Sequence, residues 1–242
     1  MNSHQGLFGG NIPQDVTGKQ GENAIFIVYG LKQSNNTIKQ VKDICANFSA
    51  LIRSMRNRFP EMQFSCTIGF GADAWKQLFP EQGNPKELKT FETIKGAKYT
   101  AVSTPGDILL HIRAKQMGLC FEFASIIDEK LKGVVDSIDE THGFRYMDGK
   151  AIIGFVDGTE NPAVDENPYH FAVIGDEDPD FIGGSYVFVQ KYIHDMTAWN
   201  SLPVEAQEKV IGRHKYNDVE LSDEEKPQNA HNAVTNIGDD LK

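Results

Sequence analysis

The sequence has 242 residues, with 24 basic and 34 acidic side chains and a formal net charge of −10 at pH 7. This length suits one large domain or two small ones, and either can bury a substantial apolar core. The acidic balance argues against nucleic acid and against an anionic membrane surface as the main partner, because both attract cationic protein surfaces.

The ends and the cysteines narrow the class of protein further. No apolar run approaches the roughly 20 residues that cross a bilayer. Residues 1–21 are polar and glycine-rich, without the basic and then apolar order of a signal peptide, so we expect a flexible leader and a cytoplasmic protein. Cys45, Cys66 and Cys120 lie far apart without a C-x-x-C pair. We interpret them as small core residues rather than as a disulfide framework or a zinc site.

The first elements of the chain alternate between strand and helix patterns. Residues 24–31 are rich in β-branched and aromatic side chains and indicate a strand. Apolar residues then recur at three- and four-residue steps from Ile38 to Met55, which predicts a helix that Pro60 ends. Residues 64–70 alternate with the period of a half-buried strand.

A strand, a helix and a strand follow. Residues 107–113 indicate a strand, and the apolar residues from Leu119 to Leu131 predict an amphipathic helix. Residues 134–145 form a poorer strand pattern, whose Thr-His-Gly indicates a kink or loop. The order strand, helix, strand, strand, helix, strand is that of the ferredoxin-like fold, in which both helices cover one face of an antiparallel sheet. We therefore expect an α+β protein whose first ferredoxin-like unit spans residues 22–148.

A second unit is expected over residues 149–242. It opens with the apolar run 152–156, which we interpret as a buried strand, and it continues with a strand at 185–193. The next helix has Pro203 at its first turn and Gly212 just past its end, the usual asymmetry of helix ends.

The run at 152–156 leads directly to a carboxylate on a turn. Asp157 is followed by Gly158, which accepts a positive φ, and Pro162 prevents a direct return to a central strand. From the residues alone, two roles of Asp157 stay open. Its carboxylate can accept hydrogen bonds from backbone N–H groups two residues on, as in an Asx turn. Alternatively, it is an acid–base group at the edge of an apolar core.

The stretch GFVDGTENP, from Gly154 to Pro162, resembles the signature of the dye-decolourising peroxidases, a family of haem enzymes. Three further segments follow in family order: GGSYVFVQKYIHD from Gly183, the helix ending in VIGRHK, and KPQNAH ending at His231. The resemblance is close from Gly154 to the C-terminus and covers the first half only in pattern. It implies a duplicated ferredoxin-like fold, with haem held in the second unit.

The resemblance also implies an activity and a set of site residues. The activity is that of a peroxidase with haem b, which uses hydrogen peroxide to oxidise bulky phenolic or dye-like small-molecule electron donors. His231 matches the axial ligand of the haem iron, and Asp157 matches the distal acid–base residue. Gly158, Thr159 and Glu160 then belong to the haem-binding loop.

For Arg213 two roles stay open: contact with a haem propionate, or complementation of the helix C-terminal dipole. In the family a distal arginine, placed after the axial histidine, stabilises the charge that develops as the peroxide bond breaks. No arginine follows His231 here. The resemblance therefore implies that the chain is truncated at its C-terminus, that its second unit is incomplete and that the distal arginine lies beyond Lys242. We accordingly expect the printed chain to retain haem weakly and to be a poor peroxidase.

Other assignments of function stay open beside the peroxidase. One is a haem-binding or iron-handling protein without significant turnover, and another is a haem-free assembly module. We further expect a homo-oligomer. The remaining histidines are interpreted as surface or structural residues, namely His4, His111, His142, His170, His194 and His214.

Overall fold

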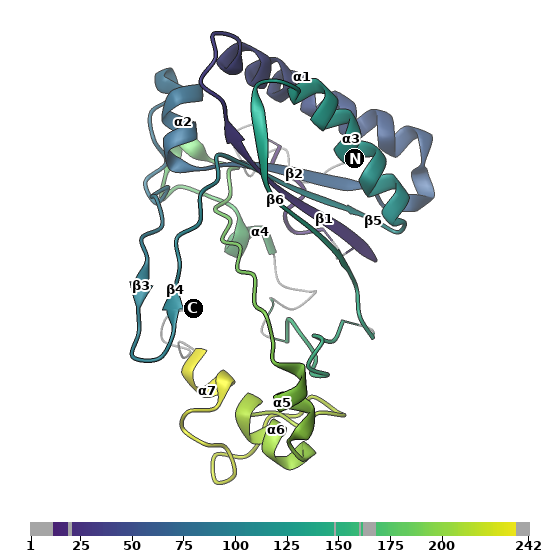
Figure 1. Cartoon of the computed structure of the whole chain (residues 1–242), viewed down its shortest axis with the longest axis vertical. Helices are drawn as coiled ribbons and strands as arrows, with labels where there is room; N and C mark the ends of the chain where they lie inside the picture. Colours follow the sequence, from purple (N-terminus) through teal and green to yellow (C-terminus); the bar gives the residue numbers. More distant parts are fainter. Residues whose placement is uncertain (1–11, 19–20, 148, 160, 162–167, 236–242) are drawn as a thin grey trace. The chain divides into compact units, whose positions relative to one another are not determined.

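The computed structural model describes residues 12–18, 21–147, 149–159, 161 and 168–235 (Figure 1). The chain divides into two compact units. Unit 1 contains Met1–Phe144 and Pro162–Phe188, and unit 2 contains Arg145–Asn161 and Val189–Lys242. None of the helices in the described ranges is long and apolar enough to cross a membrane.

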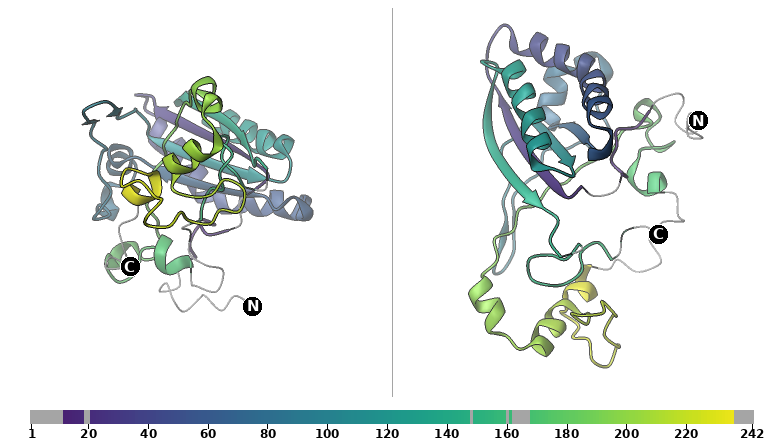
Figure 2. Two further views of the ribbon diagram at one scale, coloured as in Figure 1. Left: turned by 90° about the horizontal axis from the view of Figure 1, so that it is seen from below. Right: turned by 90° about the vertical axis from the view of Figure 1, so that its right-hand side faces the viewer.

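Unit 1 is built on a four-stranded antiparallel sheet with the strand order β2-β5-β1-β6. The strands are β1 (Asn23–Leu31), β2 (Ser65–Phe70), β5 (Ile108–Ala114) and β6 (Val135–Phe144). The helices α1 (Thr37–Arg58) and α3 (Met117–Leu131) cover one face of this sheet (Figure 2). This is the ferredoxin-like arrangement predicted from the order of the elements, and the α+β fold class is confirmed.

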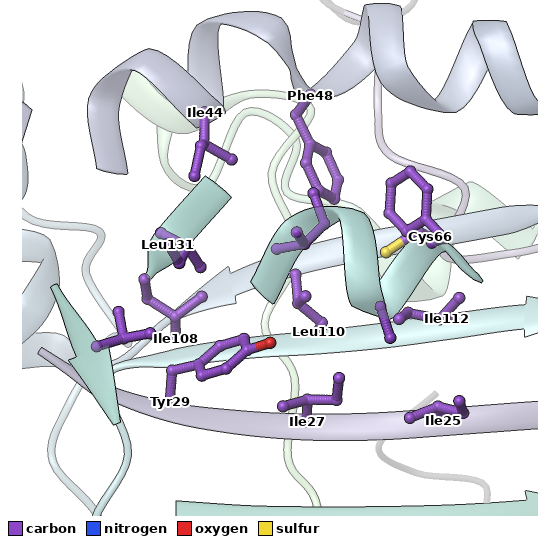
Figure 3. Close-up of a cluster of buried hydrophobic side chains, with 14 of the residues drawn as sticks. Ile25, Ile27, Tyr29, Ile44, Phe48, Cys66, Ile108, Leu110, Ile112 and Leu131 are labelled. Atoms are coloured by element: carbon purple, nitrogen blue, oxygen red, sulfur yellow. The ribbon is translucent and has the colours of Figure 1, made fainter. Parts of the chain in front are cut away.

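The core of unit 1 lies between the sheet and these two helices (Figure 3). Helix α1 buries Val41, Ile44, Phe48 and Met55, which are spaced by three, four and seven residues on one helix face. Alternate residues of the central strands meet them from the sheet: Ile25, Ile27, Tyr29, Ile108, Leu110 and Ile112. Each such side chain contributes roughly 1.5–3 kcal/mol when fully buried. This core fixes the frame of unit 1.

The three cysteines are free thiols in or beside this core, as predicted. Cys66 and Cys120 are buried, and Cys45 is half-buried. Burial raises the pKa of Cys45 and of Cys120 to about 11 and also raises the pKa of Cys66. They pack as small apolar residues.

Strand β6 is an edge strand that contains one irregularity. The Thr-His-Gly segment was predicted to be a kink, which is wrong, because Thr141 and His142 pair regularly with β1. The register instead shifts between Val28 and Tyr29 of β1, where Ile138 of β6 is the extra residue of a bulge. The one-residue insertion is therefore absorbed before the Thr-His-Gly segment is reached.

Shorter elements complete unit 1. They are the 3₁₀ turns Pro60–Met62, Pro80–Gln82 and Pro179–Phe181, the helices α2 (Ala72–Leu78) and α4 (Pro168–Ala172), and the two-residue strands β3 (Ile94–Lys95) and β4 (Thr100–Ala101). Strands β3 and β4 pair with each other as a separate hairpin.

Unit 2 contains the helices α5 (Met196–Ser201), α6 (Val204–Ile211) and α7 (His231–Thr235). Helix α6 begins after Pro203 and ends at Gly212, whose φ of +93° is left-handed, as the sequence predicted. The strands predicted at 152–156 and 185–193 are wrong. The first range folds as a tight turn, and the second, which is described throughout, belongs to no strand. Apolar runs this short do not distinguish a strand from other buried structure.

Candidate functional site

The segment that carries Asp157 is a compact turn. Gly154 has a φ of +91°, which lets the chain reverse so that the Ala151 N–H donates to the Phe155 carbonyl at 2.8 Å. The Asp157 N–H in turn donates to the Gly149 carbonyl at 3.0 Å. A turn at Gly154 therefore stands in place of the predicted strand, and it sets the backbone position of Asp157.

Phe155 anchors this turn to the helices of unit 2. Its side chain is only 3% exposed and meets the Trp199 ring edge-on, with the ring centroids 6.1 Å apart. Trp199 Nε1 also donates to the Ile153 carbonyl at 2.9 Å. The Lys215 ammonium lies 5.7 Å from the centroid of the Phe155 ring. One aromatic anchor and one indole hydrogen bond thus hold the segment against α5.

Asp157 itself is exposed, and its carboxylate makes no hydrogen bond or ion pair with any residue that the structure describes. The Asx-turn interpretation required that this carboxylate accept a backbone N–H two residues on, and that hydrogen bond is not formed among these residues. The side chain is therefore available to bind a ligand or to carry a proton.

The residues that follow Asp157 tie the turn to the segment after α6. Gly158 has a φ of +81°, and Thr159 Oγ1 donates to Asp218 Oδ2 at 2.8 Å. Asp218 has a φ of +60° and keeps Oδ1 buried without a partner. Arg213 Nη1 donates to the Asp218 carbonyl at 3.0 Å. Glu160, the third residue predicted for this loop, lies outside the described residues.

A second set of contacts connects Arg213 to the helix that begins at His231. Arg213 Nη2 lies 3.7 Å from Glu220 Oε2. Glu220 Oε1 accepts hydrogen bonds from Lys226 Nζ at 2.6 Å and from Asn232 Nδ2 at 3.0 Å. The hydrogen bond from Lys226 is the main cause that lowers the pKa of Glu220, and the same bond raises the pKa of Lys226. Glu220 therefore contacts three side chains of unit 2, those of Arg213, Lys226 and Asn232.

Asn232 also reaches the end of α6, where its Nδ2 donates to the Gly212 carbonyl at 3.2 Å. Its Oδ1 is buried and has no hydrogen-bond partner. An added Cβ at Gly212 would lie 1.7 Å from this Oδ1, so the approach of α7 to α6 depends on a glycine at this position. Ala230, which directly precedes α7, is 1% exposed and fixes the start of this helix.

His231 is the first residue of α7 and is exposed. Its imidazole has no hydrogen-bond or ion-pair partner among the residues that the structure describes. Val234 is also exposed and lies three residues further along, on the same helix face. The other histidine in this region, His214, has a partner, because its Nδ1 lies 3.3 Å from Glu208 Oε2. The contact of His214 engages Nδ1 alone, so each of these two imidazoles keeps a nitrogen that can act as a ligand.

The residue set of unit 2 suits a large apolar cofactor with a metal centre. Such a group needs one neutral imidazole and an apolar surface that it can cover. Several large apolar side chains of this unit are exposed, among them Ile152 at 62% and Ile193 at 94%. The other exposed large apolar residues described in this unit are Tyr146, Met147, Val156, Val189, Tyr192, Leu202, Val210, Tyr216, Val219 and Val234. The chemistry of the donor set therefore fits haem.

The sequence singled out Asp157 and His231 as candidate site residues, but not the residues that contact their segments. Asp218, Glu220 and Asn232 were not singled out, although an Asn-Asp pair at 217–218 is a turn signal that favours a left-handed backbone. The structure places Asp157, His231 and Arg213 in one unit. Their segments are joined by hydrogen bonds of Thr159 to Asp218, Arg213 to Asp218 and Asn232 to Glu220, and by the ion pair of Arg213 with Glu220.

Comparison with known proteins gives the family. The model of the Dyp-type peroxidase N-terminal region matches residues 13–145, and that of the C-terminal region matches residues 148–242. A dye-decolorizing peroxidase of Rhodococcus erythropolis is 48% identical over 95% of this chain and 66% of its own length. That of Mycobacterium tuberculosis is 43% identical over 94% of this chain and 67% of its own length.

Solved structures agree with these sequence matches. A dye-decolorizing peroxidase from Bacteroides thetaiotaomicron is 84% identical, with a TM-score of 0.94 over 97% of this chain and 76% of that one. DyPB from Rhodococcus jostii is 41% identical, with a TM-score of 0.88 over 94% of this chain and 73% of that one. The chain belongs to the dye-decolourising peroxidase family. It spans about two thirds of the length of the curated relatives that it matches.

Proposed function

We propose that this chain carries the haem-binding and peroxide-activating residues of a dye-decolourising peroxidase. The observation that carries the proposal is the pair of uncommitted groups in unit 2, the Asp157 carboxylate and the His231 imidazole, on segments joined by three hydrogen bonds and one ion pair. The two alternatives, haem handling without turnover and a haem-free module, leave the free carboxylate without a role.

His231 is proposed to hold haem through the lone pair of one imidazole nitrogen. When bound, the haem supplies an iron centre that accepts electrons from the donor and delivers them to the peroxide. The three cysteines of the chain contain no C-x-x-C-H attachment motif, and all three lie in unit 1. Haem held without covalent attachment, as haem b, is therefore the form that we propose.

Asp157 is proposed to move the proton of hydrogen peroxide. Its carboxylate accepts the proton from one peroxide oxygen and returns it to the other, so that the second oxygen leaves as water rather than as hydroxide. This role requires a carboxylate that is not engaged in a structural hydrogen bond, and no hydrogen bond of the Asp157 carboxylate is found among the described residues.

Thr159 and Arg213 are proposed to position this carboxylate. The Thr159 hydroxyl is committed to Asp218, and the Arg213 guanidinium is held at the Asp218 carbonyl. Gly158 provides the positive φ at which the chain turns between Asp157 and Thr159. In this arrangement Arg213 and Thr159 act through the backbone of the turn, and a contact of Arg213 with a haem propionate extends the same bracing. Glu160 is retained as a proposed residue of this loop.

The remaining parts of the proposal are a bulky phenolic or dye-like electron donor, a cytoplasmic location and self-association. Hydrogen peroxide is the proposed oxidant. The family assignment supports the donor class, and the polar, acidic sequence supports the location.

The test is peroxide consumption by the haem-loaded chain in the presence of a phenolic donor. Asp157→Asn keeps the size of the side chain but cannot accept a proton at neutral pH, and we expect the rate to fall by about 10²–10⁴-fold. Glu224→Gln, the same acid-to-amide change at an exposed position of unit 2, is the matched control and should leave the rate unchanged. Equal rates for Asp157→Asn and the unaltered chain would refute the assignment of Asp157.

A further inference from the structure

The chain contains two Asp-Gly pairs, Asp148–Gly149 and Asp157–Gly158, and the second pair carries the candidate acid–base residue. In such a pair the backbone nitrogen of the glycine can attack the carboxyl carbon of the aspartate side chain, because glycine has no Cβ that hinders the approach. The reaction is intramolecular, so its rate depends on how freely the two groups meet. The structural setting of each pair therefore sets its rate.

The nucleophile of the second pair, the Gly158 backbone nitrogen, is unengaged. Its N–H donates no hydrogen bond to any residue that the structure describes. Gly158 is exposed, and its φ of +81° lies in the left-handed region. An added Cβ there would lie 2.7 Å from Asn161 Nδ2, so the turn requires glycine at this position. The residue that makes the pair susceptible is therefore a requirement of the turn itself.

The electrophile, the Asp157 carboxyl group, is accessible as well. Asp157 is exposed, and its carboxyl oxygens have no hydrogen-bond or ion-pair partner in the described part of the chain. A hydrogen bond to these oxygens would hold the side chain in one rotamer and away from the glycine nitrogen. The Asp157 N–H donates to the Gly149 carbonyl, and the Asn161 N–H donates to the Gly158 carbonyl. These bonds hold the backbone on either side, while the two reacting groups stay uncommitted.

The first pair differs at its nucleophile. The Gly149 N–H donates to the Tyr146 carbonyl at 2.9 Å, and Gly149 is half-buried. An added Cβ at Gly149 would lie 3.3 Å from Nη2 of Arg145, so a side chain covers this glycine. Attack by this nitrogen requires that its hydrogen bond first open, which slows the reaction by about two- to tenfold for a bond of ordinary net strength. Asp148 itself lies outside the described residues.

We propose that Asp157–Gly158 is a site of spontaneous isomerisation, at which the chain converts its candidate acid–base residue to isoaspartate. The Gly158 nitrogen forms a bond to Asp157 Cγ, and the bond from Cγ to one carboxyl oxygen breaks. That oxygen leaves as water with the carboxyl proton and the proton of the Gly158 N–H, which gives a five-membered succinimide ring. Water then opens the ring at either carbonyl. Opening at the main-chain carbonyl gives isoaspartate, so the whole sequence needs no reagent except water.

Isomerisation displaces the carboxylate from its place on the turn. The backbone becomes longer by one carbon between residues 157 and 158, and the free carboxylate is then the former main-chain carbonyl group. Because the Asp157 N–H is held by the Gly149 carbonyl, the displaced carboxylate no longer occupies the position of the original side chain. The expected loss of peroxide turnover rests on the proposed function of Asp157, whereas the modification itself needs only the folded chain.

Incubation of the folded chain at mildly acidic pH, where a larger share of carboxyl groups is protonated, tests the proposal. Digestion with trypsin and with a protease that cuts after glutamate separates residues 146–150 from residues 151–160, so each peptide contains one Asp-Gly pair. The succinimide appears as a peptide lighter by one water, and isoaspartate is measured by methylation with an isoaspartyl methyltransferase. We expect residues 151–160 to be modified about two- to tenfold faster than residues 146–150.

The chain unfolded in denaturant is the matched control, because both pairs should then react at similar rates. Asp157→Glu should stop the loss of water from residues 151–160, since its side chain would have to close a six-membered ring. Equal rates for the two peptides in the folded chain, or no isoaspartate in residues 151–160, would overturn the proposal. Peroxide consumption by the haem-loaded chain should fall in step with the isomerised fraction. Unchanged consumption in a chain that has formed isoaspartate would instead refute the proposed role of Asp157 and leave the modification standing.

Discussion

A glycine that touches no candidate ligand should control whether the His231 helix can dock. At Gly212 the φ is +93°, and a Cβ would lie 1.7 Å from Asn232 Oδ1 and 2.5 Å from its Cγ. The left-handed backbone alone costs an alanine about 1–2 kcal/mol. The Asn232 side chain cannot move aside without loss of its hydrogen bonds to the Gly212 carbonyl and to Glu220, each worth about 0.5–1.5 kcal/mol. We therefore expect Gly212→Ala to destabilise the α6–α7 pair by about 2–4 kcal/mol.

Hydrogen exchange of the α6 amides measures this loss as a local opening free energy. Gly133→Ala is the matched control, because Gly133 also has a positive φ, +84°, but an added Cβ there meets nothing within 4 Å. Gly133→Ala should cost only the free energy of the left-handed backbone, measured by hydrogen exchange of the α3 amides. In an Asn232→Ala background the cost of Gly212→Ala should fall to the control value, since the clash is then removed. Equal costs for Gly212→Ala and Gly133→Ala in the unaltered background would refute the reasoning.

Three further predictions concern the bracing of the site and the core. Thr159→Val should leave Asp218 Oδ2 without its donor and destabilise the Asp157 turn by about 1–3 kcal/mol, measured by hydrogen exchange of the amides at 155–159. The control Thr235→Val removes a local hydroxyl contact in α7 and should leave those amides unchanged. Because the pKa of Glu220 is lowered in the folded chain, its contribution to stability is complete above its unfolded pKa and is lost as the pH falls through the folded pKa. Protection of the α7 amides from hydrogen exchange should therefore drop on acidification, and Glu220→Gln should remove this pH dependence. Burial raises the pKa of all three thiols, so iodoacetamide should alkylate the native chain slowly at pH 8 and the unfolded chain quickly. Equal alkylation rates would contradict the buried placement of the cysteines.

Sequence patterns predicted unit 1 well, because its elements are long and their apolar residues have one period. Helix α1 and strand β5 are examples, since each presents a regular apolar face to the shared core. The bulge at Ile138 was not predicted, because a one-residue slip in a ladder depends on the partner strand and leaves no local signal. Composition cannot show where such a slip is absorbed.

Unit 2 was harder to predict for physical reasons. The run 152–156 has the composition of a strand, but Gly154 adopts a positive φ and Phe155 packs on Trp199, so tertiary contacts override the local preference. The candidate site shows the same limit. Asp157 and His231 stand in recognisable motifs, whereas the bond from Thr159 to Asp218 joins residues 59 positions apart and follows no local rule.

The most direct test of the central claim is a haem titration of this chain, followed by the Soret absorption. We predict a haem complex that His231→Ala abolishes and that His214→Ala retains, because His231, and not His214, ends the KPQNAH segment that resembles the axial-ligand segment of the family. Hydrogen exchange of the same variants without haem should show α6 equally protected in both, which separates loss of a ligand from loss of structure. An unchanged haem spectrum and affinity in His231→Ala would contradict the account.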